Sequence, residues 1–297
     1  MIRTNRFHVV LLATLGLAIA LLGCDSGTGG TGGSGGSAGS GGSAGSGGAN
    51  GGVLRILVTN DDGVEAPGID AVVEALKDDP NNEVIVSAPL GNQSGSGDST
   101  SPPPLQAMMT TTASGYPATG VDGFPADSVI YALENLYPDA PPHVVLSGIN
   151  EGQNVGNVLG LLSQISGTVG AAKTAACLDV PALASSQGDG EVVDFPAGLV
   201  EVIAWLEANR AALLAGEVSV VNITSINIPS CDGEGEIRGT LQVPLATENP
   251  NAYLLNGPQD CTSTVEDVPN DVEAFFNGYT TITSVPSNSN MTCDKLN

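Results

Sequence analysis

Short apolar segments that end in polar turns constrain this sequence most, because they predict buried parallel strands. Residues 54–59 (LRILVT) lead into NDDG, and residues 83–88 (EVIVSA) lead into a glycine-bearing loop. Residues 144–146 precede SGIN, and residues 181–184 form a fourth run of the same kind. Brief apolar runs of this composition are typical of strands covered on both faces.

Helical patterns separate these strands. One begins at Pro67 or Gly68 and ends near Asp78, a second covers 124–136, and a third covers 167–178. Alternating strands and helices predict an α/β fold with a doubly wound, mostly parallel sheet. Ligands of such sheets bind outside the carboxyl ends of the strands. The turns NDD, NQSGSG and SGIN are therefore expected at one edge.

Later in the chain the pattern weakens. Residues 218–228 and 278–285 have strand composition, whereas the polar stretch 231–270 fits no element clearly.

The first 24 residues have the organisation of a signal peptide for lipoprotein export. Arg3 and Arg6 precede an apolar run over 9–22, which is shorter than the roughly 20 residues of a stable membrane span. The run ends in LLGC, which resembles a lipobox, so we expect cleavage before Cys24 and lipidation of that residue. The alternative is an uncleaved anchor helix. Either interpretation places the remainder outside the cytoplasm, in the bacterial cell envelope on the periplasmic or surface side.

Residues 25–52 are almost wholly Gly, Ser, Ala and Thr. A segment with so little apolar surface cannot offset its ordering entropy, so we expect a disordered tether. Residues 53–297 are long enough for one sizeable α/β domain.

The charge balance excludes one class of partner. From Cys24 onward the chain has six basic and 32 acidic residues, a formal charge of −26. Nucleic-acid polymers need several Lys or Arg contacts to their phosphates, so they are not expected partners. A small phosphate compound could still bind where a metal ion and backbone N–H groups supply positive potential.

Four cysteines follow Cys24: Cys177, Cys231, Cys261 and Cys293. Their even number in an oxidising compartment permits two disulfides in any of three pairings. Their spacing is unlike that of a zinc site. The domain contains one histidine, His143, which opens an apolar strand-like run, and we expect it to be structural.

The strand ends carry oxygen-rich side chains suited to a metal ion. Asp61 and Asp62 are adjacent, and two carboxylates in one turn repel each other unless a proton or cation intervenes. A hard divalent ion suits such a site, Mg²⁺ or Mn²⁺ first and Ca²⁺ as a further candidate. Ser94 and Asn150 could add neutral oxygens. The competing interpretation is an exposed Asp-Asp turn.

A second feature suits an anion. The turn Ser166-Gly167-Thr168 precedes a helix, whose first N–H groups can face a phosphate, although such a turn is often only a helix cap. Together with a metal on the same edge, it predicts metal-assisted hydrolysis of phosphomonoesters.

Seven motifs, in order, resemble those of the SurE family of 5'/3'-nucleotidases. They are LVTNDDGVEAPGI, APLGNQSGSG, GFPADSV, SGINEGQNVG, SGTVGAA, INIP and AFFNGYTTIT, and they span about 54–285.

The resemblance implies a SurE-like, Rossmann-like domain with a C-terminal β extension, commonly used for homodimers or higher assemblies. It implies hydrolysis of nucleoside monophosphates with one divalent cation per site. The implied metal ligands are Asp61, Asp62, Ser94 and Asn150. The implied catalytic residues are Asp61 and Asn154, and the implied phosphate-binding residues are Asn60, Gly95, Ser166, Gly167 and Thr168.

The chain departs from the family pattern in places. Ile165 stands where an aromatic residue or histidine is usual, Phe124 stands where threonine is common, and 157–164 is longer than usual. These departures bear on nucleobase preference and oligomer geometry and leave the implied metal ligands intact. Two other functions remain as alternatives: a tethered binding protein that has lost catalysis, and an acidic interaction module. A metal-dependent activity that Asp61→Asn abolishes would separate the enzyme from both.

Overall fold

A computed structural model describes residues 52–157, 161–191, 193–247 and 259–296. The predicted signal peptide, Cys24 and nearly all of the predicted tether lie outside these ranges. No helix among the described residues is both long and apolar enough to cross a membrane.

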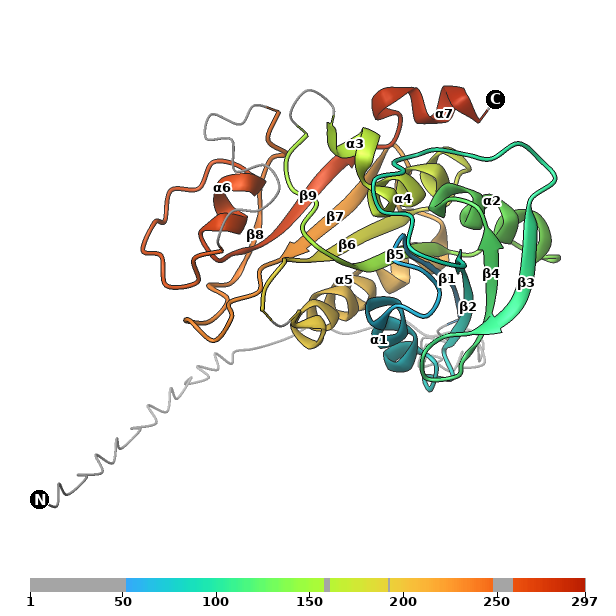
Figure 1. The fold of residues 1–297 in the computed structure, drawn as a ribbon, viewed down its shortest axis with the longest axis horizontal. Coiled ribbons are helices and arrows are strands. Elements are labelled where there is room, and N and C mark those ends of the chain that lie inside the picture. Colours follow the sequence, from blue (N-terminus) through green and yellow to red (C-terminus); the bar gives the residue numbers. More distant parts are fainter. Residues whose placement is uncertain (1–51, 158–160, 192, 248–258, 297) are drawn as a thin grey trace, which may run out of the picture. The chain divides into compact units, whose positions relative to one another are not determined.

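One sheet organises the described part of the chain (Figure 1). Its nine strands lie in the order β3-β4-β2-β1-β5-β6-β7-β9-β8. Their bounds are β1 Leu54–Thr59, β2 Asn82–Pro89, β3 Gln106–Thr111, β4 Pro117–Asp122, β5 Val144–Glu151, β6 Ala182–Gln187, β7 Asn222–Ile228, β8 Thr240–Gln242 and β9 Thr280–Pro286.

The predicted α/β class is confirmed. Strands β4, β2, β1, β5, β6 and β7 are parallel neighbours. At one edge β3 pairs antiparallel with β4. At the other, β9 pairs antiparallel with β7 and β8 pairs parallel with β9, so the C-terminal β extension lengthens the same sheet.

Helices cover both faces of this sheet, as a doubly wound fold requires. On one face α1 (Pro67–Leu76) and α5 (Phe195–Ala215) pack on β1, β5 and β7 through a core that includes Ile69, Ile56 and Leu206. On the other, α2 (Pro125–Asn135) and α4 (Gly167–Cys177) share a core with Leu57 and Val145. The remaining described helical segments are α3 (Leu161–Ile165), α6 (Asp271–Phe276), the 3₁₀ turn η2 (Ser289–Met291) and α7 (Thr292–Lys295).

Helix α5 is absent from the sequence-based interpretation, although its end signals are conventional. The Asp194 side chain accepts a hydrogen bond from Ala197 N–H, and a proline stands in the first turn. The helix ends at Gly216, whose φ of 68° suits a residue without a Cβ.

Strand β5 is longer than predicted. The SGIN segment belongs to the strand itself, because Asn150 pairs with Ser186 and Glu151 with Gln187 of β6 after an irregularity that follows Ser147.

The C-terminus is fastened to α4. Cys177 of α4 is bonded to Cys293, and the second described disulfide joins Cys231 to Cys261, which settles the pairing that the sequence left open. Lys173 of α4 is fully buried and donates to Ser289 O (2.6 Å).

Asp98 is the counter-charge of this region. Its carboxylate lies 3.6 Å from Lys173 Nζ and 2.7 Å from Lys295 Nζ, and it accepts the Thr292 hydroxyl. Burial opposes ionisation of Asp98, yet the partners Lys295, Thr292 and Lys173 leave its pKa below the usual value. Burial lowers the pKa of Lys173 to about 8. The ion pair is therefore needed to keep a charged lysine inside the protein.

We expect Asp98→Asn to lower the free energy of unfolding by roughly 3 kcal/mol at pH 7, because it leaves the buried Lys173 charge unpaired. Urea unfolding measures this loss. Asp122→Asn, at an exposed position, is the matched control. Adding Lys173→Met to Asp98→Asn should restore most of the loss. An Asp98→Asn protein as stable as the wild type would contradict this account.

Candidate functional site

The site is built around Asp61, which follows β1. Asp61 is only 3% exposed, and the Thr168 hydroxyl of α4 donates to its Oδ1 (2.8 Å). A Cβ on Gly167 would stand 2.6 Å from Asp61 Cβ, so glycine is required for this close approach. The hydrogen bond therefore joins the end of β1 to the beginning of α4.

Asp62 links the same turn to two other segments. Its Oδ2 accepts the N–H of Glu151 (3.0 Å), the residue after Asn150, and its Oδ1 lies 3.4 Å from Asn92 Nδ2. The two adjacent carboxylates thus lie where the ends of β1, β2 and β5 meet.

Asn60 shapes the turn that carries both acids. Its Nδ2 donates to Gly63 O (2.9 Å), and Gly63 N–H donates to its Oδ1 (3.2 Å). The buried Asn60 side chain thus bridges the turn and fixes its backbone. The fixed backbone in turn orients the side chains of Asp61 and Asp62.

The NQSGSG loop follows β2 and is anchored to Asp61 and to the end of α3. Gln93 N–H donates to Asp61 O (2.7 Å), and Gly97 N–H donates to Ile165 O (3.2 Å). Ser94 and Gly95 are exposed between these two anchors. Within the described residues, the Ser94 hydroxyl does not bond to either aspartate.

The predicted phosphate-binding residues Ser166, Gly167 and Thr168 have different contacts at the beginning of α4. Ser166 is the N-cap, and its hydroxyl accepts Val169 N–H (3.0 Å). Burial raises the pKa of Asp61, and hydrogen bonds from the Thr168 side chain and the Thr168 and Gly167 backbone oppose that rise. The first N–H groups of α4 thus face the Asp61 carboxylate.

Asn150 and Asn154 approach the same place from the end of β5. Asn150 is 6% exposed, and its Nδ2 donates to Gly152 O (2.5 Å). Asn154 Nδ2 donates to Ser186 Oγ (2.8 Å) and lies 3.4 Å from Thr168 Oγ1.

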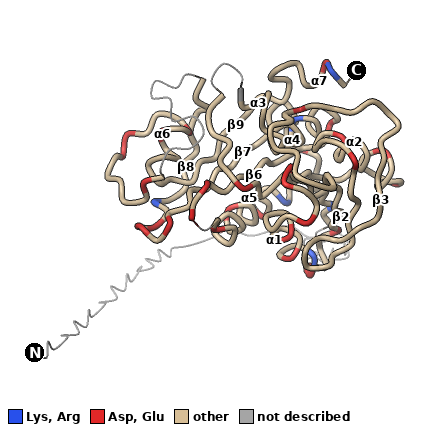
Figure 2. Tube along the Cα trace, in the orientation of Figure 1, with Lys and Arg blue, Asp and Glu red and all other residues tan. Residues whose placement is uncertain are grey.

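The electrostatics of this site favour a cation. Burial, followed by the charge of Asp61, raises the pKa of Asp62 to about 6. Within the described residues, neither aspartate forms an ion pair with Lys or Arg, and Figure 2 shows how few basic residues the trace carries. Two adjacent carboxylates, one buried and one half-buried, disfavour each other's ionised form when no protein cation is near, and a divalent ion would relieve this.

The donor set consists of two carboxylates with neutral oxygens around them. The described residues contain no cluster of three or more His, Cys, Asp or Glu suited to a metal ion. His143 pairs with Arg55: its ring Nδ1 accepts the Arg55 backbone N–H (2.9 Å), and its backbone N–H donates to Arg55 O (2.9 Å). The expected structural role of His143 is confirmed.

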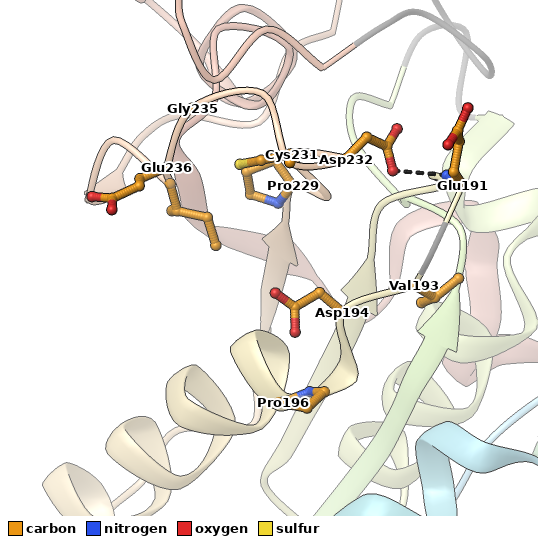
Figure 3. A pocket seen from close by; sticks show the side chains of 11 residues that line it. Glu191, Val193, Asp194, Pro196, Pro229, Cys231, Asp232, Gly235 and Glu236 are labelled. Atoms are coloured by element: carbon orange, nitrogen blue, oxygen red, sulfur yellow. Dashed lines mark hydrogen bonds between the residues drawn. The ribbon is translucent and has the colours of Figure 1, made fainter. Parts of the chain in front are cut away.

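One cavity adjoins these segments, and a second lies apart from them. One of about 370 Å³ lies beside Asp62 and is lined also by Glu151, Leu90 and Phe195. Another of about 790 Å³ lies between the start of α5 and the segment after β7 (Figure 3).

The carboxylates of the second cavity hold the backbone. Asp232 accepts Glu191 N–H (2.7 Å), as Figure 3 shows, and Asp194 accepts Ala197 N–H (3.2 Å). None of the predicted metal-binding, catalytic or phosphate-binding residues lines this cavity.

Sequence reasoning missed Ser186 and Asn227, two buried polar residues near the carboxyl ends of β6 and β7. Both bond to Asn154. The sequence contains a signal that could have identified them: polar residues within otherwise apolar strands, in the segments SSQ and INIP.

Comparison with known proteins gives a consistent result. The family model described as "Survival protein SurE" matches residues 56–251. "5'-nucleotidase SurE 1" of Burkholderia lata is 43% identical over 133 residues, which cover 45% of this chain and 48% of that protein. The chain thus spans about half the length of that relative.

Other relatives are covered more fully. "5'-nucleotidase SurE" of Methanopyrus kandleri is 37% identical over 204 residues, which cover 65% of this chain and 72% of the relative. "5'-nucleotidase SurE" of Alkaliphilus metalliredigens is 34% identical over 248 residues, which cover 78% of this chain and 92% of the relative. The crystal structure of the SurE protein from Aquifex aeolicus superposes with a TM-score of 0.61 and 28% identity over 78% of this chain and 93% of that one. The chain belongs to the SurE family.

Proposed function

We propose that this chain is a divalent-metal-dependent phosphomonoester hydrolase, a 5'/3'-nucleotidase that acts on nucleoside monophosphates. The observation that carries the proposal is the pair of adjacent carboxylates at the end of β1, one of them 3% exposed, with Asn150, Asn154 and the start of α4 beside it. Relatives of this chain are named 5'-nucleotidases, which supports nucleoside monophosphates as the substrate class.

The residues fit a hard divalent ion. Asp61 and Asp62 would supply the charged oxygens, and Asn150 and Ser94 would supply neutral ones, a set that suits Mg²⁺ or Mn²⁺ and also accommodates Ca²⁺. Such an ion supplies Lewis acidity and lowers the pKa of a bound water.

The chain's own groups would orient the reactants. Thr168 donates to the Asp61 carboxylate, and Asn154 contacts Thr168 through Nδ2, so the amide oxygen of Asn154 would serve the reactants. Backbone N–H groups of Gly95 and of the start of α4 would bind the phosphate, because such groups stabilise anions. The acidic chain disfavours nucleic-acid polymers, so a small phosphomonoester is the expected substrate.

We expect the purified chain to hydrolyse p-nitrophenyl phosphate and nucleoside monophosphates, to lose activity in EDTA, and to regain it with Mg²⁺ or Mn²⁺. Asp61→Asn should lower kcat/KM at least about a thousandfold, because it removes a charged ligand from the ion. A colorimetric phosphate assay measures both effects, with Asp122→Asn as the control at an exposed acid. Folded wild-type protein without turnover with any of these ions would contradict the proposal.

A second test concerns stability rather than activity. Folding raises the pKa of Asp62 from 3.8 to about 6, so the folded protein binds more protons between these values and ionised Asp62 costs stability at pH 7. In EDTA at pH 7.5, Asp62→Asn should therefore stabilise the protein by about 1–2 kcal/mol, allowing for partial solvent screening.

The gain should fall as the pH drops below about 6 and should vanish well below pH 3.8, where the wild-type carboxyl is protonated in both states. Thermal unfolding with and without Mn²⁺ measures it, and the variant should lose the stabilisation that Mn²⁺ gives the wild type. An Asp62→Asn protein that is less stable than the wild type in EDTA would contradict this electrostatic account.

The proposal extends to location and assembly. It places the protein in the cell envelope, anchored to a membrane only through lipid on Cys24, as a homodimer or higher homo-oligomer. The composition of residues 1–24 supports export, and the family resemblance supports self-association.

Metabolic labelling with an alkyne fatty acid tests the anchor. The label should appear on wild-type protein in the membrane fraction and disappear in Cys24→Ser. Label retained by Cys24→Ser would contradict lipidation at this residue.

A further inference from the structure

A row of polar side chains crosses three parallel strands at their carboxyl ends. Asn150 of β5 is in register with Ser186 of β6, and Ser186 is in register with Asn227 of β7. All three are buried, Ser186 and Asn227 to within 1% exposure. Laterally paired residues of a sheet point to the same face. This row therefore lies on the face covered by α4, whose Thr168 contacts Asp61.

Asn227 holds the backbone of Asn154 at two points. Its Oδ1 accepts Asn154 N–H (2.6 Å), and its Nδ2 donates to Asn154 O (3.2 Å). A single amide side chain thus satisfies both backbone groups of one residue, as a neighbouring strand would. Asn154 lies in a segment, 153–157, without regular secondary structure. Its backbone position is accordingly fixed by side chains rather than by a helix or sheet.

The direction of the Asn154 amide follows from the hydroxyl that it meets. Thr168 has one hydroxyl proton, which it donates to the Asp61 carboxylate, so Thr168 Oγ1 can only accept from Asn154. Asn154 therefore presents Nδ2 to Thr168 and to Ser186 Oγ. Its Oδ1 is left as an acceptor, and within the described residues no group donates to it.

We propose that Asn227 is the positioning residue of the reaction: it clamps the backbone of Asn154 so that the Asn154 amide oxygen is directed at the attacking water or the phosphate. The inference rests on the proposed function. Asn227 itself contacts neither substrate nor ion and acts through Asn154. The acceptor that Asn154 presents suits the proton of a water molecule, whereas its two donor positions are already occupied by Ser186 and Thr168.

The alternative is a purely structural role, in which Asn227 only satisfies buried backbone groups and thereby stabilises the fold. The two roles differ in what a truncation changes. A structural role lowers stability and leaves the kcat of the folded fraction intact, whereas a positioning role lowers kcat in protein that stays folded.

We therefore expect Asn227→Ala to lower kcat about tenfold to a hundredfold at saturating Mn²⁺, while KM changes less than about twofold, since misplacing a reacting group by about 1 Å has effects of this size. Ser225→Ala is the matched control, because Ser225 is a buried residue of the same strand that touches Asn227 but not Asn154. It should keep wild-type kcat. Asn227→Asp, nearly the same shape, replaces the donor to Asn154 O by an oxygen and should also lose kcat.

A readout independent of turnover is amide hydrogen exchange of the peptide that contains Asn154. Exchange there should rise in Asn227→Ala and stay at the wild-type rate in Ser225→Ala, in protein whose thermal unfolding confirms that it is folded. Unchanged kcat in folded Asn227→Ala and Asn227→Asp, or equal losses in Ser225→Ala, would overturn the inference while leaving the nucleotidase proposal standing. Wild-type protein without metal-restored turnover would overturn both.

Discussion

The burial of Asp61 beside a second carboxylate is the constraint on which the rest of the site depends. A carboxylate that is 3% exposed, next to another whose pKa rises to about 6, is costly unless a cation balances both. The neighbouring groups orient the two carboxylates, but among the described residues no Lys or Arg forms an ion pair with them. Thr168 binds Asp61, the Glu151 N–H binds Asp62, and Asn60 fixes the turn between them. The fold thus preserves a local negative potential at the carboxyl edge of a parallel sheet.

The parallel sheet explains how distant segments reach this place. The ends of β1, β2 and β5 bring Asp61, the NQSGSG loop and Asn150 to one edge, and α4 starts where it can bond to Asp61. Glycine makes these approaches feasible at two points: Gly167 lies against Asp61, and a Cβ on Gly170 would meet Gly97 O at 2.1 Å. The row from Asn150 through Ser186 to Asn227 then extends the polar edge across two further strands.

Local patterns in the sequence were sufficient for the central strands and for helices α1, α2 and α4, because burial on both faces selects short apolar runs. The edge hairpin β3–β4 escaped prediction, since β3 exposes Met108 and Met109 and lacks such a run. Helix α5 has clear capping residues, Asp194 and Gly216, and could have been predicted from them. The disulfide pairing and the links of Asn154 to Ser186 and Asn227 depend on contacts between residues far apart in the chain. Single-sequence periodicity does not encode such contacts.

The most direct test of the account is the position of a bound ion. Anomalous diffraction from crystals grown with Mn²⁺ should show a peak between Asp61 and Asp62, with oxygens of Asn150 and Ser94 within about 2–2.5 Å, the distances that hard divalent ions require. A peak only in the acidic cavity lined by Glu191, Asp194, Asp232 and Glu236, or no peak at saturating Mn²⁺, would contradict the metal site on which the proposed function rests.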